Sequence, residues 1–171
     1  MDIKIESIKQ EEKELLWKLL QLALYDGSFY VDNQINDAGE FEYNWFDCYF
    51  TDNDRFAYLI KCDKNIAGFA LVNGNLKIKH DCNAQTIAEF LILPQYRKRQ
   101  IGKKAAHMIF DKFDGVWEVQ PMDNNDGAYK FWEKIIKEYT NDQYKIYNFE
   151  DQEDVLFFKS KMLYNYKQGS D

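Results

Sequence analysis

The spacing of apolar residues changes several times along the chain, and each change predicts an element. In residues 11–25 the apolar side chains recur at intervals of three and four, the spacing of one buried face of an α-helix. Gly27 follows as a helix stop signal. Residues 100–113 and 125–139 show the same period. The pattern therefore predicts three main helices, and a short fourth around residues 42–50.

Runs of β-branched and aromatic residues between the helices predict strands. Residues 56–61 and 66–72 are separated by Asp63-Lys64-Asn65, the signature of a β-hairpin. Residues 86–93 are almost continuously apolar, which is typical of a strand buried on both faces. Four other short runs predict the remaining strands: 3–8, 116–119, 143–149 and 155–163.

The order of these elements is β-α-α-β-β-β-α-β-α-β-β. This order predicts an α+β protein, with a mixed central sheet and helices on both of its faces. The chain has 171 residues, and neither a repeat nor a Gly/Ser linker divides it. We therefore expect a single domain over residues 1–171.

Composition narrows the function classes. The chain has 22 basic and 29 acidic residues and a net charge of −7, which argues against a general nucleic-acid or membrane-surface binder. Its three cysteines form no CxxC pair, so neither a disulfide framework nor a metal site is expected. The start of the chain lacks the apolar region of a signal peptide. These features together favour a cytoplasmic protein.

One short stretch concentrates positive charge on this acidic chain. In LPQYRKRQIGKKAA, residues 93–106, a buried strand is followed by a basic loop and then by a helix. The first amides of a helix point outward and carry a partial positive charge, so they bind anions. Gly102 has no side chain to keep a phosphate from the backbone. The stretch predicts a phosphate-binding turn, with a solvated basic helix face as the competing interpretation.

Three motifs carry a resemblance to a known family. They are PQYRKRQIG at 94–102, WEV at 117–119 and NDGAYKFW at 125–132. Together they resemble the GNAT superfamily of N-acetyltransferases. The family signature Q/R-x-x-G-x-G/A falls on Arg97, Gln100 and Gly102, so Gln100 stands where a glycine is expected. The segments LYDGSF, FDCYFTDNDRFAYLI and IAGFALVNG look like a bacterial group of predicted GNAT acetyltransferases, so the resemblance covers the whole chain.

The resemblance implies acetyl-CoA as a co-substrate, bound between two splayed parallel strands at 86–93 and 116–120. The pantetheine arm would pair with the backbone of the first strand, and Asn125 would hydrogen-bond to it. The pyrophosphate would lie on the basic loop. The implied cofactor-binding residues are Phe90, Leu91, Ile92, Arg97, Lys98, Arg99, Gln100, Ile101, Gly102, Lys103 and Asn125.

An amine must lose a proton before it attacks a thioester, so a base is needed. Glu89 interrupts an apolar strand, and Glu118 lies on the neighbouring one. One of them is expected to be the catalytic base, while an exposed or ion-paired strand glutamate is the alternative for each. The family's usual acid, a tyrosine, is replaced by Trp132, which we interpret as a packing residue. Tyr129 is an alternative acid, and the acid stays unassigned.

The sequence thus favours an N-acetyltransferase that acts directly on a primary amine of a small molecule or a peptide. The acidic, aromatic segment 26–54 favours a cationic acceptor. The alternative is an acyl-CoA-binding sensor with weak catalysis, and nucleic-acid binding through residues 97–104 ranks last. A homodimer is compatible with the resemblance. His80 and His107 are interpreted as isolated surface histidines.

Overall fold

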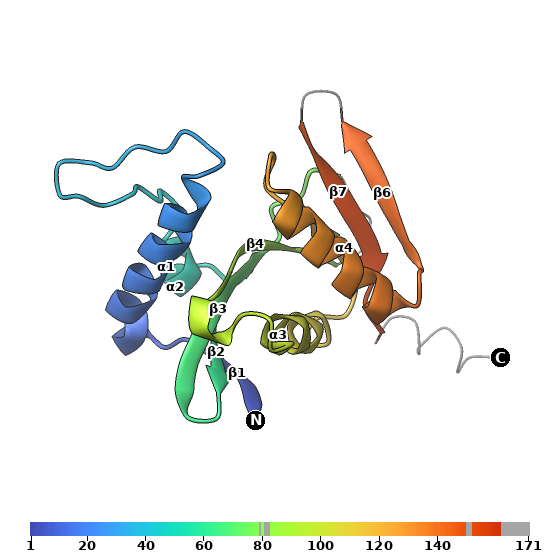
Figure 1. The fold of residues 1–171 in the computed structure, drawn as a ribbon, viewed down its shortest axis with the longest axis horizontal. Coiled ribbons are helices and arrows are strands. Elements are labelled where there is room, and N and C mark those ends of the chain that lie inside the picture. The colour runs from blue at the N-terminus through green and yellow to red at the C-terminus, as the bar shows by residue number, and fades with distance from the viewer. Residues whose placement is uncertain (79, 81–82, 150–151, 162–171) are drawn as a thin grey trace. The chain divides into compact units, whose positions relative to one another are not determined.

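The structure is a computed structural model that describes residues 1–78, 80, 83–149 and 152–161. Its strands form a seven-stranded mixed sheet in the order β1-β2-β3-β4-β5-β7-β6 (Figure 1). The elements are β1 (Ile3–Ser7), η1 (Gln10–Glu12), α1 (Lys13–Gly27), α2 (Cys48–Thr51), β2 (Arg55–Cys62), β3 (Asn65–Asn73), β4 (Ala84–Ile92), η2 (Pro94–Tyr96), α3 (Ile101–Phe110), β5 (Val116–Val119), α4 (Asp126–Thr140), β6 (Tyr144–Phe149) and β7 (Gln152–Lys159).

The predicted α+β order is confirmed, and the differences lie at the ends of elements. The short helix predicted around 42–50 is only the single turn Cys48–Thr51. The last strand, predicted at 155–163, begins earlier at Gln152 and ends at Lys159, while residues 162 and 163 lie outside the described residues. The chain divides into two compact units, Met1–Asn73 with Ala88–Ile101 and Gly74–Ile87 with Gly102–Asp171. The expectation of a single domain stays a prediction.

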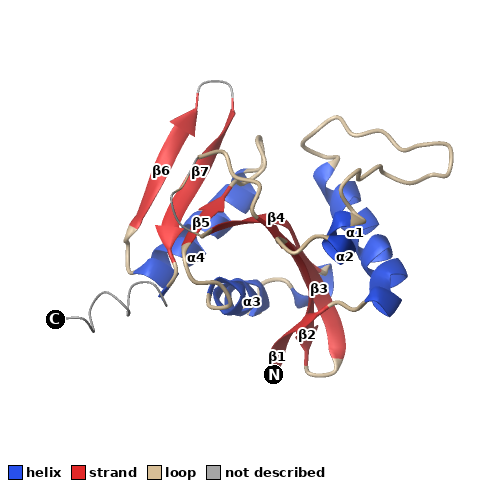
Figure 2. Cartoon of the chain, turned by 180° about the vertical axis from the view of Figure 1, so that it is seen from behind, coloured by secondary structure: helices blue, strands red, loops and turns tan. Residues whose placement is uncertain are grey.

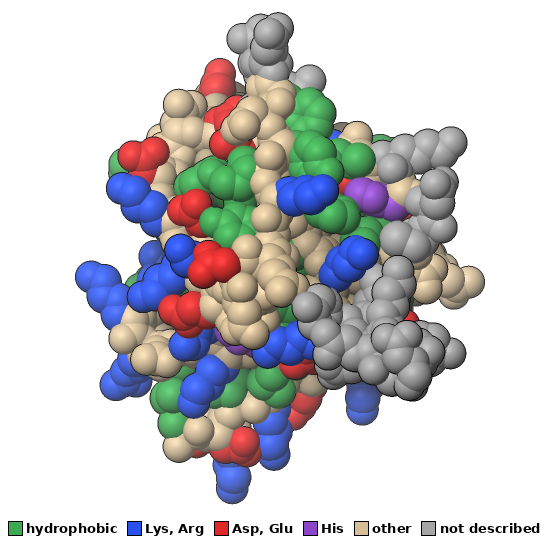
Figure 3. Space-filling view, turned by 90° about the vertical axis from the view of Figure 1, so that its right-hand side faces the viewer, with side chains coloured by type: hydrophobic (Ala, Val, Ile, Leu, Met, Phe, Trp, Pro, Cys, Tyr) green, Lys and Arg blue, Asp and Glu red, His purple; other side chains and the backbone are tan. Residues whose placement is uncertain are grey.

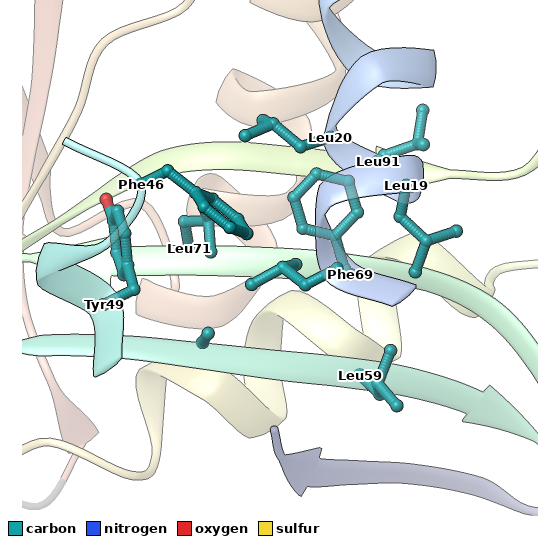
Figure 4. Packing of buried hydrophobic residues seen from close by; sticks show 10 residues of the cluster. Leu19, Leu20, Phe46, Tyr49, Leu59, Phe69, Leu71 and Leu91 are labelled. Atoms are coloured by element: carbon teal, nitrogen blue, oxygen red, sulfur yellow. The ribbon is translucent and has the colours of Figure 1, made fainter. Parts of the chain in front are cut away.

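The first unit is built on an antiparallel meander. β1 pairs with β2, and β2 pairs with β3 across the tight turn that follows Cys62. Helix α1 supplies Leu16, Leu19 and Leu20 to an apolar cluster with Phe69 and Leu71 of β3. Figure 4 shows Leu19, Leu20 and Phe46 gathered with the side chains of β3 in this cluster.

The middle parts of β2 and β3 are buried on both faces. Leu59 of β2 belongs to the cluster under α1, and Ile60, which points the opposite way, is also fully buried. Gly68 of β3 lies so close to β4 that a Cβ atom there would be 1.9 Å from the carbonyl oxygen of Leu91. Only glycine allows this approach of the two backbones.

The second unit contains the parallel pair. Ala84–Thr86 of β4 pairs with Val116–Glu118 of β5, and β4 continues to Ile92. β5 pairs antiparallel with β7, which forms a hairpin with β6 (Figure 2). The core of this unit is aromatic: Phe110 of α3 makes edge contacts with Trp117, Tyr139 and Phe158.

Candidate active site

The basic loop that follows β4 contains two residues with left-handed backbone. Lys98 and Gln100 both have φ of 60°. Glycine adopts this conformation without strain, whereas other residues pay about 1–2 kcal/mol. Gln100 stands where the signature has a glycine, and it takes the backbone conformation that a glycine favours. The loop therefore keeps a turn in spite of the substitution.

Two of the basic side chains of this region are held by protein groups. The guanidinium of Arg97 donates from Nε to the carbonyl oxygen of Ile92 at 2.8 Å and forms an ion pair with Asp26. The ammonium group of Lys103 donates to Glu138 of α4 at 2.9 Å. Lys98 and Arg99 are exposed. An anion at this turn would thus meet backbone amides and exposed side chains, while Arg97 fixes the turn to the end of β4.

The backbone of β4 has two edges. The amide of Leu93 donates to the carbonyl oxygen of Ala67 on β3 at 2.8 Å, and the carbonyl of Leu91 also lies against β3. Because peptide groups alternate along a strand, those of Phe90 and Ile92 point toward the opposite edge. This is the edge on which the resemblance places the pantetheine arm.

Glu89 lies on β4 and is half-buried. Burial raises the pKa of its carboxyl group from 4.5 to about 7, and a hydrogen bond from the Tyr43 hydroxyl acts in the opposite direction. Burial is also the main cause that raises the pKa of Tyr43 and of Tyr49. A carboxyl group with a pKa near 7 is suited to accept a proton from an amine at physiological pH.

Glu118 has a different environment. It is fully buried on β5 and accepts hydrogen bonds from the backbone amides of Lys77 (2.9 Å) and Ile78 (3.1 Å). Its Oε1 also lies 2.6 Å from Nε2 of His80. These contacts tie the segment after β3 to β5, which is the arrangement of a structural carboxylate. Its assignment as a base stays a prediction.

The interpretation of both histidines as isolated surface residues was wrong. The side chain of His80 is 11% exposed, contacts Glu118, and stacks on Phe157 with 5.2 Å between ring centroids. A ring nitrogen of His107 lies 2.9 Å from the carbonyl oxygen of Ile135, and burial lowers the pKa of the His107 imidazole. Neither partner is near its histidine in the sequence, so the spacing gave no signal.

The start of α4 is fixed by Asn125. Its Oδ1 accepts a hydrogen bond from the amide of Ala128 at 2.9 Å, which makes it the N-cap of the helix. This bond leaves the amide NH₂ group of the same side chain as the part suited to contact a pantetheine carbonyl. Trp132 is buried against Phe110, so its interpretation as a packing residue is confirmed. Burial raises the pKa of the Tyr129 hydroxyl.

Sequence reasoning missed three residues near Glu89. Tyr49 and Asn73 are both buried, and the Asn73 amide donates to the Tyr49 hydroxyl at 2.9 Å. Tyr43 interacts with both Tyr49 and Glu89. Tyr43 and Tyr49 lie in the aromatic segment 26–54, where their hydroxyl groups gave no pattern that distinguished them from packing residues.

The described ranges contain no group of three or more His, Cys, Asp or Glu side chains placed to hold a metal ion. None of the helices in the described ranges is both long and apolar enough to cross a membrane. On the face drawn in Figure 3, basic and acidic side chains lie interspersed. This face therefore does not have the continuous basic surface that nucleic-acid binding favours.

The fold is a mixed sheet with a parallel β4–β5 pair, and the basic turn and α3 lie between these two strands in the sequence. The sequence model of the Acetyltransferase (GNAT) family matches residues 13–136, and the chain belongs to this family. No curated protein matches the sequence.

Solved structures similar to this one belong to proteins of low sequence identity. The PaiA N-acetyltransferase of Thermoplasma acidophilum, in complex with coenzyme A, has 15% identity and a TM-score of 0.60, covering 93% of this chain and 99% of its own. An aminoglycoside acetyltransferase, also with coenzyme A, has 11% identity and a TM-score of 0.64, covering 98% and 99%. The ribosomal-protein alanine N-acetyltransferase of Escherichia coli has 11% identity and a TM-score of 0.58, covering 91% of both chains. At these identities the likeness concerns the fold.

Proposed function

We propose that the protein transfers the acetyl group of acetyl-CoA directly to a primary amine of a small molecule or a peptide. Membership of the GNAT family supports acetyl transfer. The observation that carries the choice of an amine is Glu89, a half-buried carboxylate whose pKa of about 7 suits it to take a proton from an ammonium group. Metal ions have no part in this proposal.

The donor would be held by backbone groups. Amides from Lys98 to Lys103 would bind the pyrophosphate at the turn before α3, and the edge of β4 from Phe90 to Ile92 would pair with the pantetheine arm. For Asn125, a contact of its NH₂ group with the pantetheine is an implication of the resemblance. Holding the thioester beside the amine can lower the barrier by roughly 7–11 kcal/mol.

Glu89 would act as the general base. It would remove a proton from the acceptor, whose amine has a pKa of about 10.4 when free, either directly or through a water molecule. The amine nitrogen then bonds to the thioester carbon, the carbon–sulfur bond breaks, and the CoA thiolate leaves and takes a proton from solvent. The nitrogen releases its second proton to solvent as the amide forms, and Glu89 later returns its proton to solvent. Glu118 would hold the segment after β3 through its bonds to Lys77 and Ile78.

The acidic segment supports a cationic acceptor. Between Lys18 and Arg55 the chain has no lysine or arginine. The acidic residues in this interval are Asp26, Asp32, Asp37, Glu40, Glu42, Asp47, Asp52 and Asp54. A neutral or anionic acceptor would gain nothing from this charge, whereas a polyamine or an aminoglycoside would be attracted to it. We place this reaction in the cytoplasm, on the grounds of the cysteine usage.

A panel of polyamines, aminoglycosides, amino acids and peptides, assayed for CoA release from acetyl-CoA, tests the proposal. We expect turnover with at least one cationic amine and its loss in the Glu89→Gln variant. Glu11→Gln removes an exposed carboxylate outside the acidic segment and serves as the matched control, with activity retained. CoA binding without turnover of any amine would instead support the sensor.

One observation favours that second function. Trp132, at the position of the family's usual acid, is buried, and indole does not release its proton in this pH range. A sensor would bind acetyl-CoA at the same turn without needing this acid.

A further inference from the structure

A group of polar side chains is buried in the apolar core of the first unit, beside Glu89. Tyr49 and Asn73 are each 6% exposed, and Tyr49 belongs to the same core cluster as Phe46 and Leu71. Buried polar groups destabilise a core unless they are hydrogen-bonded. The 2.9 Å bond from the Asn73 amide to the Tyr49 hydroxyl satisfies one part of this group. The rest of it leads through Tyr43 to the Glu89 carboxylate.

The protonation of Glu89 decides the direction of these hydrogen bonds. The Tyr49 oxygen accepts from Asn73, and Tyr49 shares a second hydrogen bond with Tyr43. Tyr43 has one proton and two possible acceptors, Tyr49 and Glu89. An ionised carboxylate is a stronger acceptor than a phenol oxygen. When Glu89 is charged, the donors therefore run from Asn73 through Tyr49 and Tyr43 to Glu89.

We propose that Tyr43 is a positioning residue for Glu89. Its hydroxyl, oriented through Tyr49 and Asn73, donates a hydrogen bond to one carboxylate oxygen and leaves the other to take the proton of the acceptor amine. The inference rests on the proposed function, because it assigns the carboxylate a base. Tyr43 itself makes no contact with the substrate in this proposal.

The other charged groups near this array do not replace it. Arg55 of β2 lies 5.5 Å from the ring centroid of Tyr49, and its charge lowers the pKa of both tyrosine hydroxyls, against the larger effect of burial. Burial keeps both tyrosine hydroxyls protonated, since it raises the pKa of each. Tyr43 and Tyr49 therefore serve as fixed donors and do not take up the proton that Glu89 receives.

The first experiment needs no amine substrate. In protein labelled with ¹³C-glutamate, the Glu89 carboxyl resonance, assigned by its loss in Glu89→Gln, is titrated in the wild type and in Tyr43→Phe. Removing the donor is expected to raise the pKa of Glu89 by about one unit or more. Tyr58→Phe, a hydroxyl deletion at another tyrosine 6% exposed in the same unit, is the control and should leave the titration unchanged. An unchanged Glu89 titration in Tyr43→Phe overturns the inference.

The second experiment uses the amine turned over in the panel. The acidic limb of kcat/KM should move to higher pH in Tyr43→Phe by the same amount as the NMR titration, with CoA affinity unchanged. A wild type that turns over no amine refutes the proposed function. An active wild type whose acidic limb does not move in Tyr43→Phe refutes only the role of Tyr43.

Should Tyr43→Phe fail to fold, Tyr49→Phe provides the same readout. It keeps the Tyr43 hydroxyl but removes the donor that orients it, so a smaller movement of the Glu89 titration in the same direction is expected. A titration identical to that of the wild type would contradict the array.

Discussion

Replacing Glu89 with glutamine should stabilise the protein at alkaline pH, although it should abolish acetyl transfer. The carboxyl group has a pKa of about 7 in the folded chain against an ordinary value of 4.5. A carboxyl group with a raised pKa stabilises the fold fully below pH 4.5, and this contribution is lost as the pH rises through 7. Glutamine carries no charge, so its contribution to the free energy of unfolding does not change with pH.

The magnitude follows from the same two values. Their difference, at about 1.4 kcal/mol per pH unit, amounts to about 3 kcal/mol at pH 8. For a chain of this size that corresponds to a rise in Tm of roughly 6–12 °C, at about 2–4 °C per kcal/mol. Near pH 4.5 and below, the wild type and Glu89→Gln should differ little, because both side chains are then neutral.

Urea denaturation between pH 4.5 and 8 measures this difference. Glu138→Gln is the control, because its effect on the unfolding free energy at alkaline pH should have the opposite sign. The ion pair with Lys103 lowers the pKa of Glu138, so its removal should decrease the unfolding free energy at alkaline pH. A Glu89→Gln variant that is no more stable than the wild type at pH 8 would refute the conclusion that Glu89 is a desolvated carboxylate.

Substitutions at three other positions test the framework around the site. Glu118→Ala leaves the amides of Lys77 and Ile78 without their acceptor, so the unfolding free energy should fall by about 3 kcal/mol or more in urea denaturation; an unchanged value would argue against a structural role. Gln100→Val places a β-branched residue at φ of 60° and should weaken CoA binding roughly tenfold by calorimetry, while Gln100→Gly should retain it. Gly68→Ala should cost about 1–3 kcal/mol of stability, because its Cβ meets the Leu91 carbonyl oxygen; a neutral result in thermal denaturation would contradict the close approach of β3 and β4.

Local patterns predicted the elements well because they depend on neighbours in the sequence. The helical period of residues 11–25 led to α1, and the Asp63-Lys64-Asn65 turn led to the β2–β3 hairpin. Asn125 was expected at the start of a helix, and it is the N-cap of α4. The parallel pair was implied by the resemblance rather than by a local pattern, and the structure has it between β4 and β5.

The environment of each glutamate did not follow from the sequence. Glu89 and Glu118 look alike as single acidic residues in apolar strands. Their difference arises from partners that are distant along the chain: Tyr43 for Glu89, and the segment at 77–80 for Glu118. The same applies to His80, whose interaction spans 38 positions. Such pairs depend on tertiary packing, which no local period encodes.

The ion pair between Arg97 and Asp26 joins two regions with separate tasks. Asp26 lies in the last turn of α1, where the acidic segment begins, and Arg97 opens the turn assigned to the pyrophosphate. If a ligand at one region changes the affinity of the other region through this pair, the coupling is reciprocal. A ligand at the second region then changes the affinity of the first by the same factor. Both side chains are nearly half exposed, so the pair is worth at most about 1 kcal/mol. Through this pair, the binding of acetyl-CoA can therefore change the affinity for the amine by no more than about fivefold, and the reverse holds equally.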